Sequence, residues 1–223
     1  MKKLQNFIII IGITISITSF AQLANKDVAN GLKEALTTGI SKAADLVSVT
    51  DGYFKNPQIK IPFPPEVKKV ESRLRQMGMG KTVDNFVLTL NRAAEEAAKE
   101  SKPIFVGAIK QLTIDDAFSL LKGTPDAATQ FLKRTTTTGL KQKFSPIVQA
   151  ALDKTSATKY YKDIINTYNK IPLVKKENPD LNAYATDRTI EGLFVMIAKE
   201  EKNIRDNPVA RTTDLLKKVF SLK

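Results

Sequence analysis

The chain has 223 residues, of which 35 are Lys or Arg and 23 are Asp or Glu, giving a formal net charge of +12. It contains no Cys, His or Trp. The absence of Cys and His excludes cysteine nucleophiles, Ser-His triads, zinc sites of the usual kind and di-iron sites with Glu-x-x-His ligands, so we expect no cofactor. An enzyme built on this sequence would depend on carboxylate, Lys, Tyr or Ser side chains.

The N-terminus reads MKKLQNFIIIIGITISITSFAQ. Two lysines precede a mainly apolar run, and the small-x-small triplet Ser19-Phe20-Ala21 follows it, which is the pattern of a secretory signal peptide. We therefore expect residues 1–21 to be removed between Ala21 and Gln22. A permanent membrane anchor is the alternative, but the apolar run is short and the cleavage site follows it directly.

The mature chain, residues 22–223, is long enough for a single domain with its own core. Loss of the two N-terminal lysines leaves 33 basic against 23 acidic side chains, a net charge of +10. No later stretch is apolar enough to span a bilayer. We predict an exported protein, periplasmic or envelope-associated, with no transmembrane segment in the mature chain.

Helical spacing of apolar residues first appears over residues 27–49. The next segment, residues 51–65 (DGYFKNPQIKIPFPP), contains four prolines and cannot be helical throughout. Because it also carries five large apolar side chains, we expect it to pack on the surface of the domain. Residues 66–77 resume a helix rich in basic side chains.

Residues 81–112 form the longest unbroken helical pattern, and we expect the other helices to lie against it. One face is apolar, with alanines in its middle. The opposite face collects polar residues: Asp84, Asn91, Arg92, Glu95, Lys99 and Lys102. Pro103 removes a backbone donor and clashes with the preceding turn, so it predicts a kink or break near residues 100–102.

Alanines in the middle of the apolar face let another helix approach closely, or leave a shallow groove if none does. Glu96 and Glu100 lie one turn apart at the border of this face and would look into such a groove. The candidate groove is lined by Ala93, Ala97, Glu96, Glu100, Tyr160 and Tyr184. The alternative is a solvated flank with ordinary i,i+4 pairs between Arg92 and Glu96 and between Glu95 and Lys99.

Several helix starts follow. Thr113 with Asp116 predicts a capping box for a helix closed by Gly123, and Thr124-Pro125-Asp126 begins the next helix. Ser145-Pro146 is expected to begin another. Further helices are predicted over residues 156–170, 180–207 and the segment after Pro208. Because no alternating strand pattern appears, we predict an all-α single-domain bundle of roughly eight or nine helices around a central amphipathic helix.

Gly78-Met79-Gly80-Lys81-Thr82 ends like a phosphate-binding loop. That motif also needs a glycine where Arg75 stands and a strand in front, and both are missing. We interpret the segment as a joint between helices, in which Gly78 caps one helix and the next starts beyond Gly80. The remaining enzymatic hypothesis is a carboxylate-dependent cell-wall glycosidase, with Glu96, Glu100 or Glu191 as the acid in a partly apolar cleft.

The basic residues are spread along the sequence without one dense block. Export argues against nucleic acid as the natural partner. A basic exported protein would meet anionic lipid head groups, polysaccharide or cell-wall polymer. The alternative is a charged surface that serves solubility.

Five blocks together resemble the domain-of-unknown-function family 4197, a family of exported bacterial proteins. They are GLKEALTTGI (31–40), NPQIKIPFPPEV (56–67), NRAAEEAAK (91–99), DAATQFLKR (126–134) and NPVARTTDLLKKVF (207–220). The resemblance implies an all-helical periplasmic or envelope protein and implies no activity, cofactor or catalytic residue. The leading hypothesis is therefore a non-enzymatic binding or envelope-interaction protein. The alternatives are the glycosidase and a structural scaffold or assembly partner.

Overall fold

The computed structural model describes residues 5–154, 157–170, 172–173, 176, 180–207, 209 and 217. The side chains of residues 5–24 and of positions 66, 73, 157, 160, 163, 164, 167 and 168 lie outside this description. The elements are α1 (Gln5–Val47), η1 (Pro65–Val67), α2 (Lys68–Gln76), α3 (Gly80–Ala98), α4 (Ser101–Lys110), α5 (Ile114–Lys122), α6 (Ala127–Lys154), α7 (Ala157–Tyr168) and α8 (Leu181–Asp206). No strand occurs among the described residues, so the predicted all-α fold class is confirmed.

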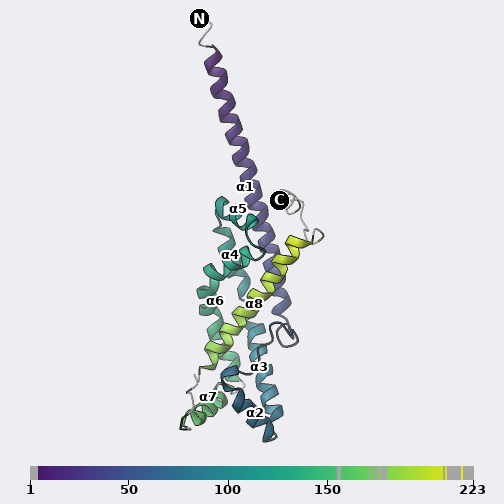
Figure 1. Ribbon diagram of the computed structural model, residues 1–223, viewed down its shortest axis with the longest axis vertical. Coiled ribbons are helices and arrows are strands. Elements are labelled where there is room, and N and C mark those ends of the chain that lie inside the picture. Colours follow the sequence, from purple (N-terminus) through teal and green to yellow (C-terminus); the bar gives the residue numbers. More distant parts are fainter. Residues whose placement is uncertain are drawn as a thin grey trace.

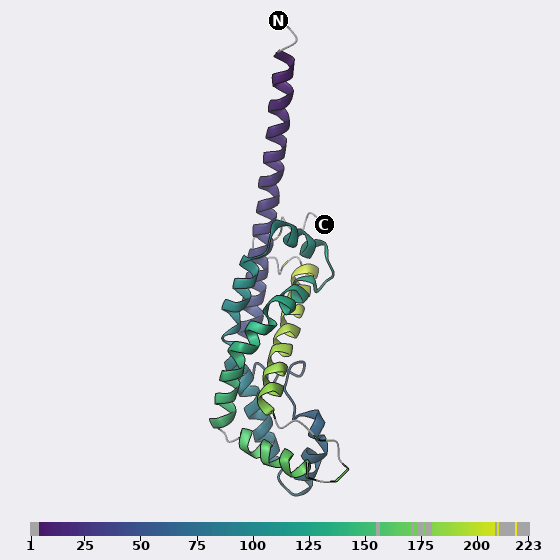
Figure 2. The same cartoon turned by 90° about the vertical axis from the view of Figure 1, so that its left-hand side faces the viewer.

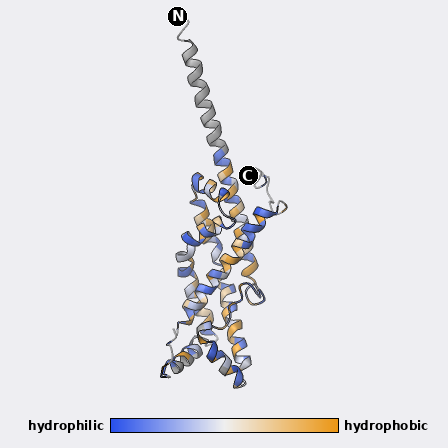
Figure 3. Ribbon diagram, in the orientation of Figure 1, coloured by the Kyte–Doolittle hydropathy of each residue, from blue (hydrophilic) through white to orange (hydrophobic). Residues whose placement is uncertain are grey.

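The long helices run along the long axis of the body, and the short helices lie at its ends (Figures 1 and 2). α2 and α7 lie at one end, together with the start of α3, and α5 lies at the other. Hydrophilic and hydrophobic residues alternate around the helices of the body, as expected for amphipathic helices (Figure 3). Among the residues with placed side chains, no helix is long and apolar enough to cross a membrane.

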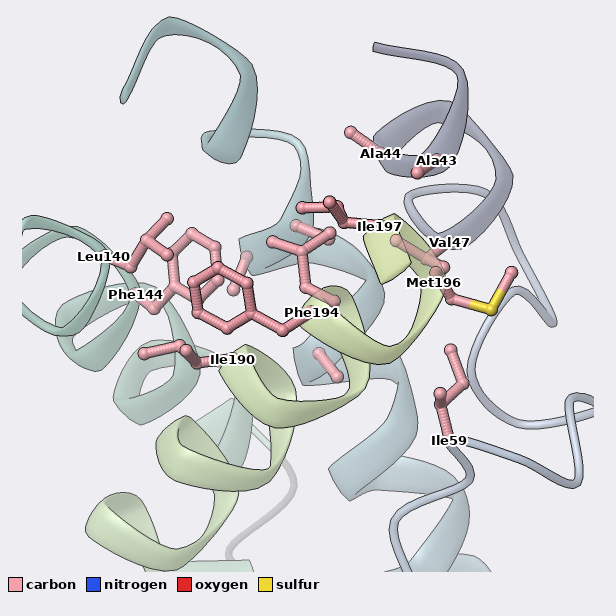
Figure 4. Packing of buried hydrophobic residues seen from close by; sticks show 14 of the residues in the cluster. Ala43, Ala44, Val47, Ile59, Leu140, Phe144, Ile190, Phe194, Met196 and Ile197 are labelled. Carbon is pink, nitrogen blue, oxygen red and sulfur yellow. The ribbon is translucent and has the colours of Figure 1, made fainter. Parts of the chain in front are cut away.

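α8 is one of the long helices that hold the bundle together. It packs against α1, α3, α6 and α7. Figure 4 shows Phe194 of α8 directed toward Leu140 and Phe144 of α6, with Met196 and Ile197 nearer to α1. The rings of Phe194 and Phe105 also meet edge to face, with centroids 5.8 Å apart. α8 therefore packs four earlier helices, α1, α3, α6 and α7, onto one core.

The predicted break at Pro103 is confirmed. α3 ends at Ala98 and α4 begins at Ser101, so Pro103 lies in the first turn of α4, where its missing N–H removes no helical hydrogen bond. The hydroxyl of Ser101 donates to the carbonyl oxygen of Ala98 at 2.7 Å and closes the gap between the two helices.

The predicted helix start at Ser145-Pro146 is wrong, because α6 runs through Pro146 without a break. Four apolar side chains continue one buried stripe across the proline: Leu140, Phe144, Val148 and Leu152. A proline inside a helix costs about 3 kcal/mol. Burying the two large side chains beyond it contributes about 1.5–3 kcal/mol each, which is enough to keep the helix continuous.

The helix predicted after Pro208 falls almost entirely outside the described residues, so the predicted number of helices stays a prediction. Residues 48–64 form no helix, and Tyr53, Ile59, Ile61 and Phe63 are all buried. This proline-rich segment lies against α3 and α8 and is held to them by hydrogen bonds with Glu95, Asn91 and the carbonyl oxygen of Thr189.

Candidate functional site

The alanines of the predicted groove have no exposed surface. Ala93 and Ala97 are completely buried, and so are Ala94 and Ala98. α6 and α8 both pack against α3, and small side chains allow that close approach. The face of α3 that was expected to leave a groove is therefore filled by helix packing.

The other residues of the predicted groove do not gather around these alanines. Glu96 and Glu100 are exposed, and the carboxylate of Glu96 pairs with Lys99 at 2.5 Å. The hydroxyl of Tyr184 donates to the carbonyl oxygen of Pro62 at 3.2 Å. Tyr160 belongs to α7, but its side chain lies outside the described residues. Glu96 and Glu100 thus lie on a solvated flank.

Two polar residues that sequence periodicity placed on the outer face of α3 are buried instead. Asn91 has no exposed surface, and its amide pairs with both main-chain groups of Ile61. Its Oδ1 accepts from the Ile61 N–H at 2.8 Å, and its Nδ2 donates to the Ile61 carbonyl at 2.8 Å and to the Val87 carbonyl at 2.7 Å. The prediction for Asn91 was wrong because the proline-rich segment covers this side of the helix.

Glu95 holds the same segment one turn further along α3. Its Oε1 accepts from the main-chain N–H groups of Tyr53 at 3.1 Å and Phe54 at 3.2 Å. Its Oε2 accepts from Arg92 at 2.6 Å, and Arg92 also binds Asp51 at 2.7 Å. Glu95 is buried, so the prediction that it faces solvent was also wrong.

The charged side chains around this segment stabilise one another in their ionised forms. Hydrogen bonds from Lys55 and then Arg92 hold the pKa of Asp51 below its usual value. Hydrogen bonds to Glu95 and Asp51 raise the pKa of the Arg92 guanidinium. Burial, assisted by the charge of Glu95, raises the pKa of the Tyr53 phenol well above its usual value. The neutral Tyr53 hydroxyl donates to the carbonyl oxygen of Thr189 on α8 at 2.6 Å.

A second buried carboxylate, Glu201 of α8, has the same kind of role at the opposite end of the molecule. It accepts from the main-chain N–H groups of Ala128 at 3.0 Å and Thr129 at 2.9 Å, at the start of α6. Arg205 binds Glu201 at 2.8 Å and the Leu120 carbonyl at 2.9 Å. Both carboxylates therefore satisfy main-chain donors, and their hydrogen-bonding capacity serves the fold.

The end of the bundle formed by α2, the α2–α3 turn, the start of α3 and α7 has a different character, and we call it the basic end. Gly78 ends α2 in the left-handed conformation, with φ of 79°. The Met79 N–H donates to the Leu74 carbonyl at 3.0 Å and the Gly78 N–H to the Arg75 carbonyl at 3.1 Å, which is a Schellman motif. The predicted joint at Gly78 is confirmed, but α3 starts at Gly80 itself and not beyond it.

This turn presents two methionines to solvent. The exposed fractions of Met77 and Met79 are 66% and 40%. Arg75 braces the turn, because its guanidinium binds Glu71 at 3.0 Å and Asp84 at 2.9 Å. The methionines are therefore held outward by a cap and an ion-pair bridge.

α7 joins the same end through an aromatic cluster. The ring of Phe86 on α3 lies 5.1 Å from that of Phe63 and 6.0 Å from that of Tyr161 on α7, measured between centroids. Leu173 follows α7 by five residues, has a φ of 67° and is fully exposed. Five residues reach at most about 18 Å, so Leu173 belongs to this end of the molecule.

The basic end carries a net positive charge, whereas three described segments of the opposite end are together neutral. Residues 64–86 and 157–170 contain eight basic and four acidic residues, a net charge of +4. The opposite end, residues 25–36, 110–134 and 200–207, contains eight basic and eight acidic residues. Six exposed lysines at the basic end form no ion pair with a described carboxylate: Lys68, Lys69, Lys81, Lys159, Lys162 and Lys170.

Sequence reasoning noted the basic helix at residues 66–77 but missed this site, because its residues come from two segments about 80 positions apart. The available signal was local: two methionines beside glycines, immediately followed by Lys81, at a predicted joint between helices.

Comparison with known proteins gives one match. The sequence model of a family described as "Protein of unknown function (DUF4197)" matches residues 22–221. No curated protein matches the chain. No solved structure matches it either.

Proposed function

We propose that this chain, which belongs to the DUF4197 family of proteins of unknown function, is an exported, non-enzymatic protein that binds an anionic component of the cell envelope through its basic end. The observation that carries the proposal is the uneven charge along the long axis, with +4 at the basic end and none at the other. Export is supported by the signal-peptide pattern of residues 1–21.

The surface charge has a magnitude that suits reversible binding. A Lys or Arg close to an anionic surface contributes about 1 kcal/mol, and the effect falls off within a Debye length of about 8 Å at physiological salt. Three exposed lysines of α2 and the start of α3, Lys68, Lys69 and Lys81, would together contribute about 3 kcal/mol, or roughly a hundredfold in affinity. Binding of this kind weakens steeply as salt is added.

No specific observation favours the glycosidase. A carboxyl group that donates a proton to a glycosidic oxygen needs an apolar enclosure. Glu96 and Glu191 are each 59% exposed and paired with Lys99 and Arg188. Glu100 is exposed as well. Among the described residues, the two buried carboxylates accept hydrogen bonds from main-chain N–H groups.

The proposal is tested with the protein from Gln22 onward, which keeps the whole family match and every described core residue. Binding is measured to immobilised dextran sulfate and to vesicles containing phosphatidylglycerol, over a range of salt concentrations. The test variant is Lys68→Gln/Lys69→Gln/Lys81→Gln. The matched control, Lys110→Gln/Lys122→Gln/Lys133→Gln, removes the same charge from the neutral end.

We expect the test variant to lose roughly a hundredfold in affinity for the anionic probe and the control variant only a few-fold. Equal losses in the two variants would show that only overall charge matters, and the proposal would then fail. Absence of binding to both probes would also refute it. In that event the scaffold hypothesis would gain support, and crosslinking in intact cells followed by mass spectrometry would identify the assembly partner.

A further inference from the structure

We infer that the basic end docks on an anionic lipid bilayer, with Met77, Met79 and Leu173 entering the boundary between head groups and acyl chains. This inference rests on the proposed function, since it names the anionic partner of the same site. It adds a second kind of contact, an apolar one, to the charge-dependent contact argued above.

The first step is the placement of exposed apolar side chains. Eight large hydrophobic residues are exposed among the described residues, and three of them belong to the basic end: Met77, Met79 and Leu173. They project from two separate connections, the α2–α3 turn and the chain after α7. Both helices that lead into these connections lie at the same end of the body in two perpendicular views (Figures 1 and 2).

The second step is the arrangement of charge around them. Lys81 follows the turn directly, Lys68 and Lys69 begin α2, and Lys159 and Lys162 are exposed on α7. Exposed apolar side chains and exposed lysines at the same end of a molecule form the interfacial pattern of proteins that lie on membranes: the apolar groups enter the interface and the lysines meet lipid phosphates. The long lysine side chains reach outward while their stems stay along the protein.

The third step separates a bilayer from other anionic partners. A soluble polysaccharide or wall polymer offers no apolar phase, so it would gain nothing from Met77 or Met79. A stable protein–protein interface needs about 800 Å² on each partner with a continuous apolar centre. The three apolar residues here stand apart among charges, which suits a fluid partner that adapts to scattered side chains. Methionine is flexible and polarisable, and it fits such a surface well.

The chain has no Trp, so a single substitution provides a clean fluorescent reporter. The test uses vesicles of phosphatidylcholine with and without phosphatidylglycerol, and lipids brominated on their acyl chains as quenchers. The Met77→Trp variant reports on the turn. The Leu46→Trp variant is the control, because Leu46 is 51% exposed on the flank of α1, away from the basic end.

We expect the fluorescence of the Met77→Trp variant to shift to the blue and to be quenched by brominated lipid only when phosphatidylglycerol is present. The control variant should show neither effect. A Met77→Ser/Met79→Ser variant should bind phosphatidylglycerol vesicles about tenfold more weakly, while its binding to dextran sulfate stays unchanged. Circular dichroism confirms that the exposed substitutions leave the fold intact.

The outcomes distinguish the two proposals. If the lysine variant weakens binding but the methionine variant does not, and the Met77→Trp reporter stays in water, the bilayer inference is refuted and the proposed function stands. Binding to dextran sulfate without binding to phosphatidylglycerol vesicles likewise refutes the bilayer inference and leaves the proposed function standing. Absence of binding to either probe overturns both.

Discussion

Two adjacent glutamates on α3 should differ widely in their contribution to stability, although the sequence gives them the same appearance. The Glu95→Ala substitution removes the acceptor of the Tyr53 and Phe54 N–H groups. A buried donor left without a partner costs about 1–3 kcal/mol, so the two together cost about 2–6 kcal/mol. Arg92 keeps Asp51 as its partner, so no charge is left alone and the central value is about 4 kcal/mol.

The matched control is Glu96→Ala, which removes an exposed ion pair with Lys99. Such pairs contribute less than about 1 kcal/mol. For a domain of this size, about 4 kcal/mol corresponds to a fall in Tm of roughly 8–16 °C, whereas the control should melt within a few degrees of the unchanged protein.

Thermal unfolding followed by circular dichroism measures the change in Tm of both variants. Urea unfolding measures the change in their free energy of unfolding independently. A Glu95→Gln variant should fall between the two, because the amide oxygen still accepts from both N–H groups while the charge facing Arg92 is lost. If Glu95→Ala and Glu96→Ala unfold at the same temperature and urea concentration, Glu95 does not anchor the proline-rich segment and the prediction is wrong.

Four further substitutions, one of them a control, test the packing and the buried phenol. Gly192→Ala should destabilise the fold by about 1–3 kcal/mol in urea unfolding, since a Cβ there would lie 2.7 Å from the Tyr53 ring. Gly107→Ala is its control: nothing lies within 4 Å of that Cβ, and the helix should gain about 0.5–1 kcal/mol. Because burial raises the pKa of Tyr53, the folded state keeps a proton above pH 10 that the unfolded state loses, and stability falls as pH rises. Tyr53→Phe should remove up to about 1.4 kcal/mol per pH unit of that slope between pH 10 and 11, and an unchanged slope would contradict the buried phenol. Pro146→Ala should raise the stability by about 1–3 kcal/mol in the same assay, and a loss would show that α6 needs the proline.

The sequence predicted those features that depend on neighbouring residues. The capping box is present as expected, with the Asp116 N–H donating to Thr113 Oγ1 at 3.0 Å and the Thr113 N–H donating to Asp116 Oδ2 at 2.9 Å. The break at Pro103 and the turn at Gly78 follow from φ restrictions and missing donors, which are also local.

The errors concern features that depend on distant residues. Asn91 and Glu95 bind partners 30 and 42 positions away, and periodicity alone assigns any residue off the apolar stripe to water. The alanine groove failed for a related reason, because a stripe of small residues looks the same whether a helix fills it or not. Predicting the charge distribution would have required knowing that α2 and α7 lie at the same end of the molecule.

Tyr53 has a consequence for how the molecule opens. Its N–H is held by α3 and its hydroxyl by a carbonyl of α8, 136 positions further along the chain. The two helices cannot separate without breaking the main-chain or the side-chain hydrogen bond of this one residue, so we expect the segment around Tyr53 to exchange its amide hydrogens only when the whole bundle unfolds. A protease that nicked this segment would leave both halves tied to the helices they already contact. The stretch that looks most like a surface loop in the sequence would then be among the slowest parts of the protein to open.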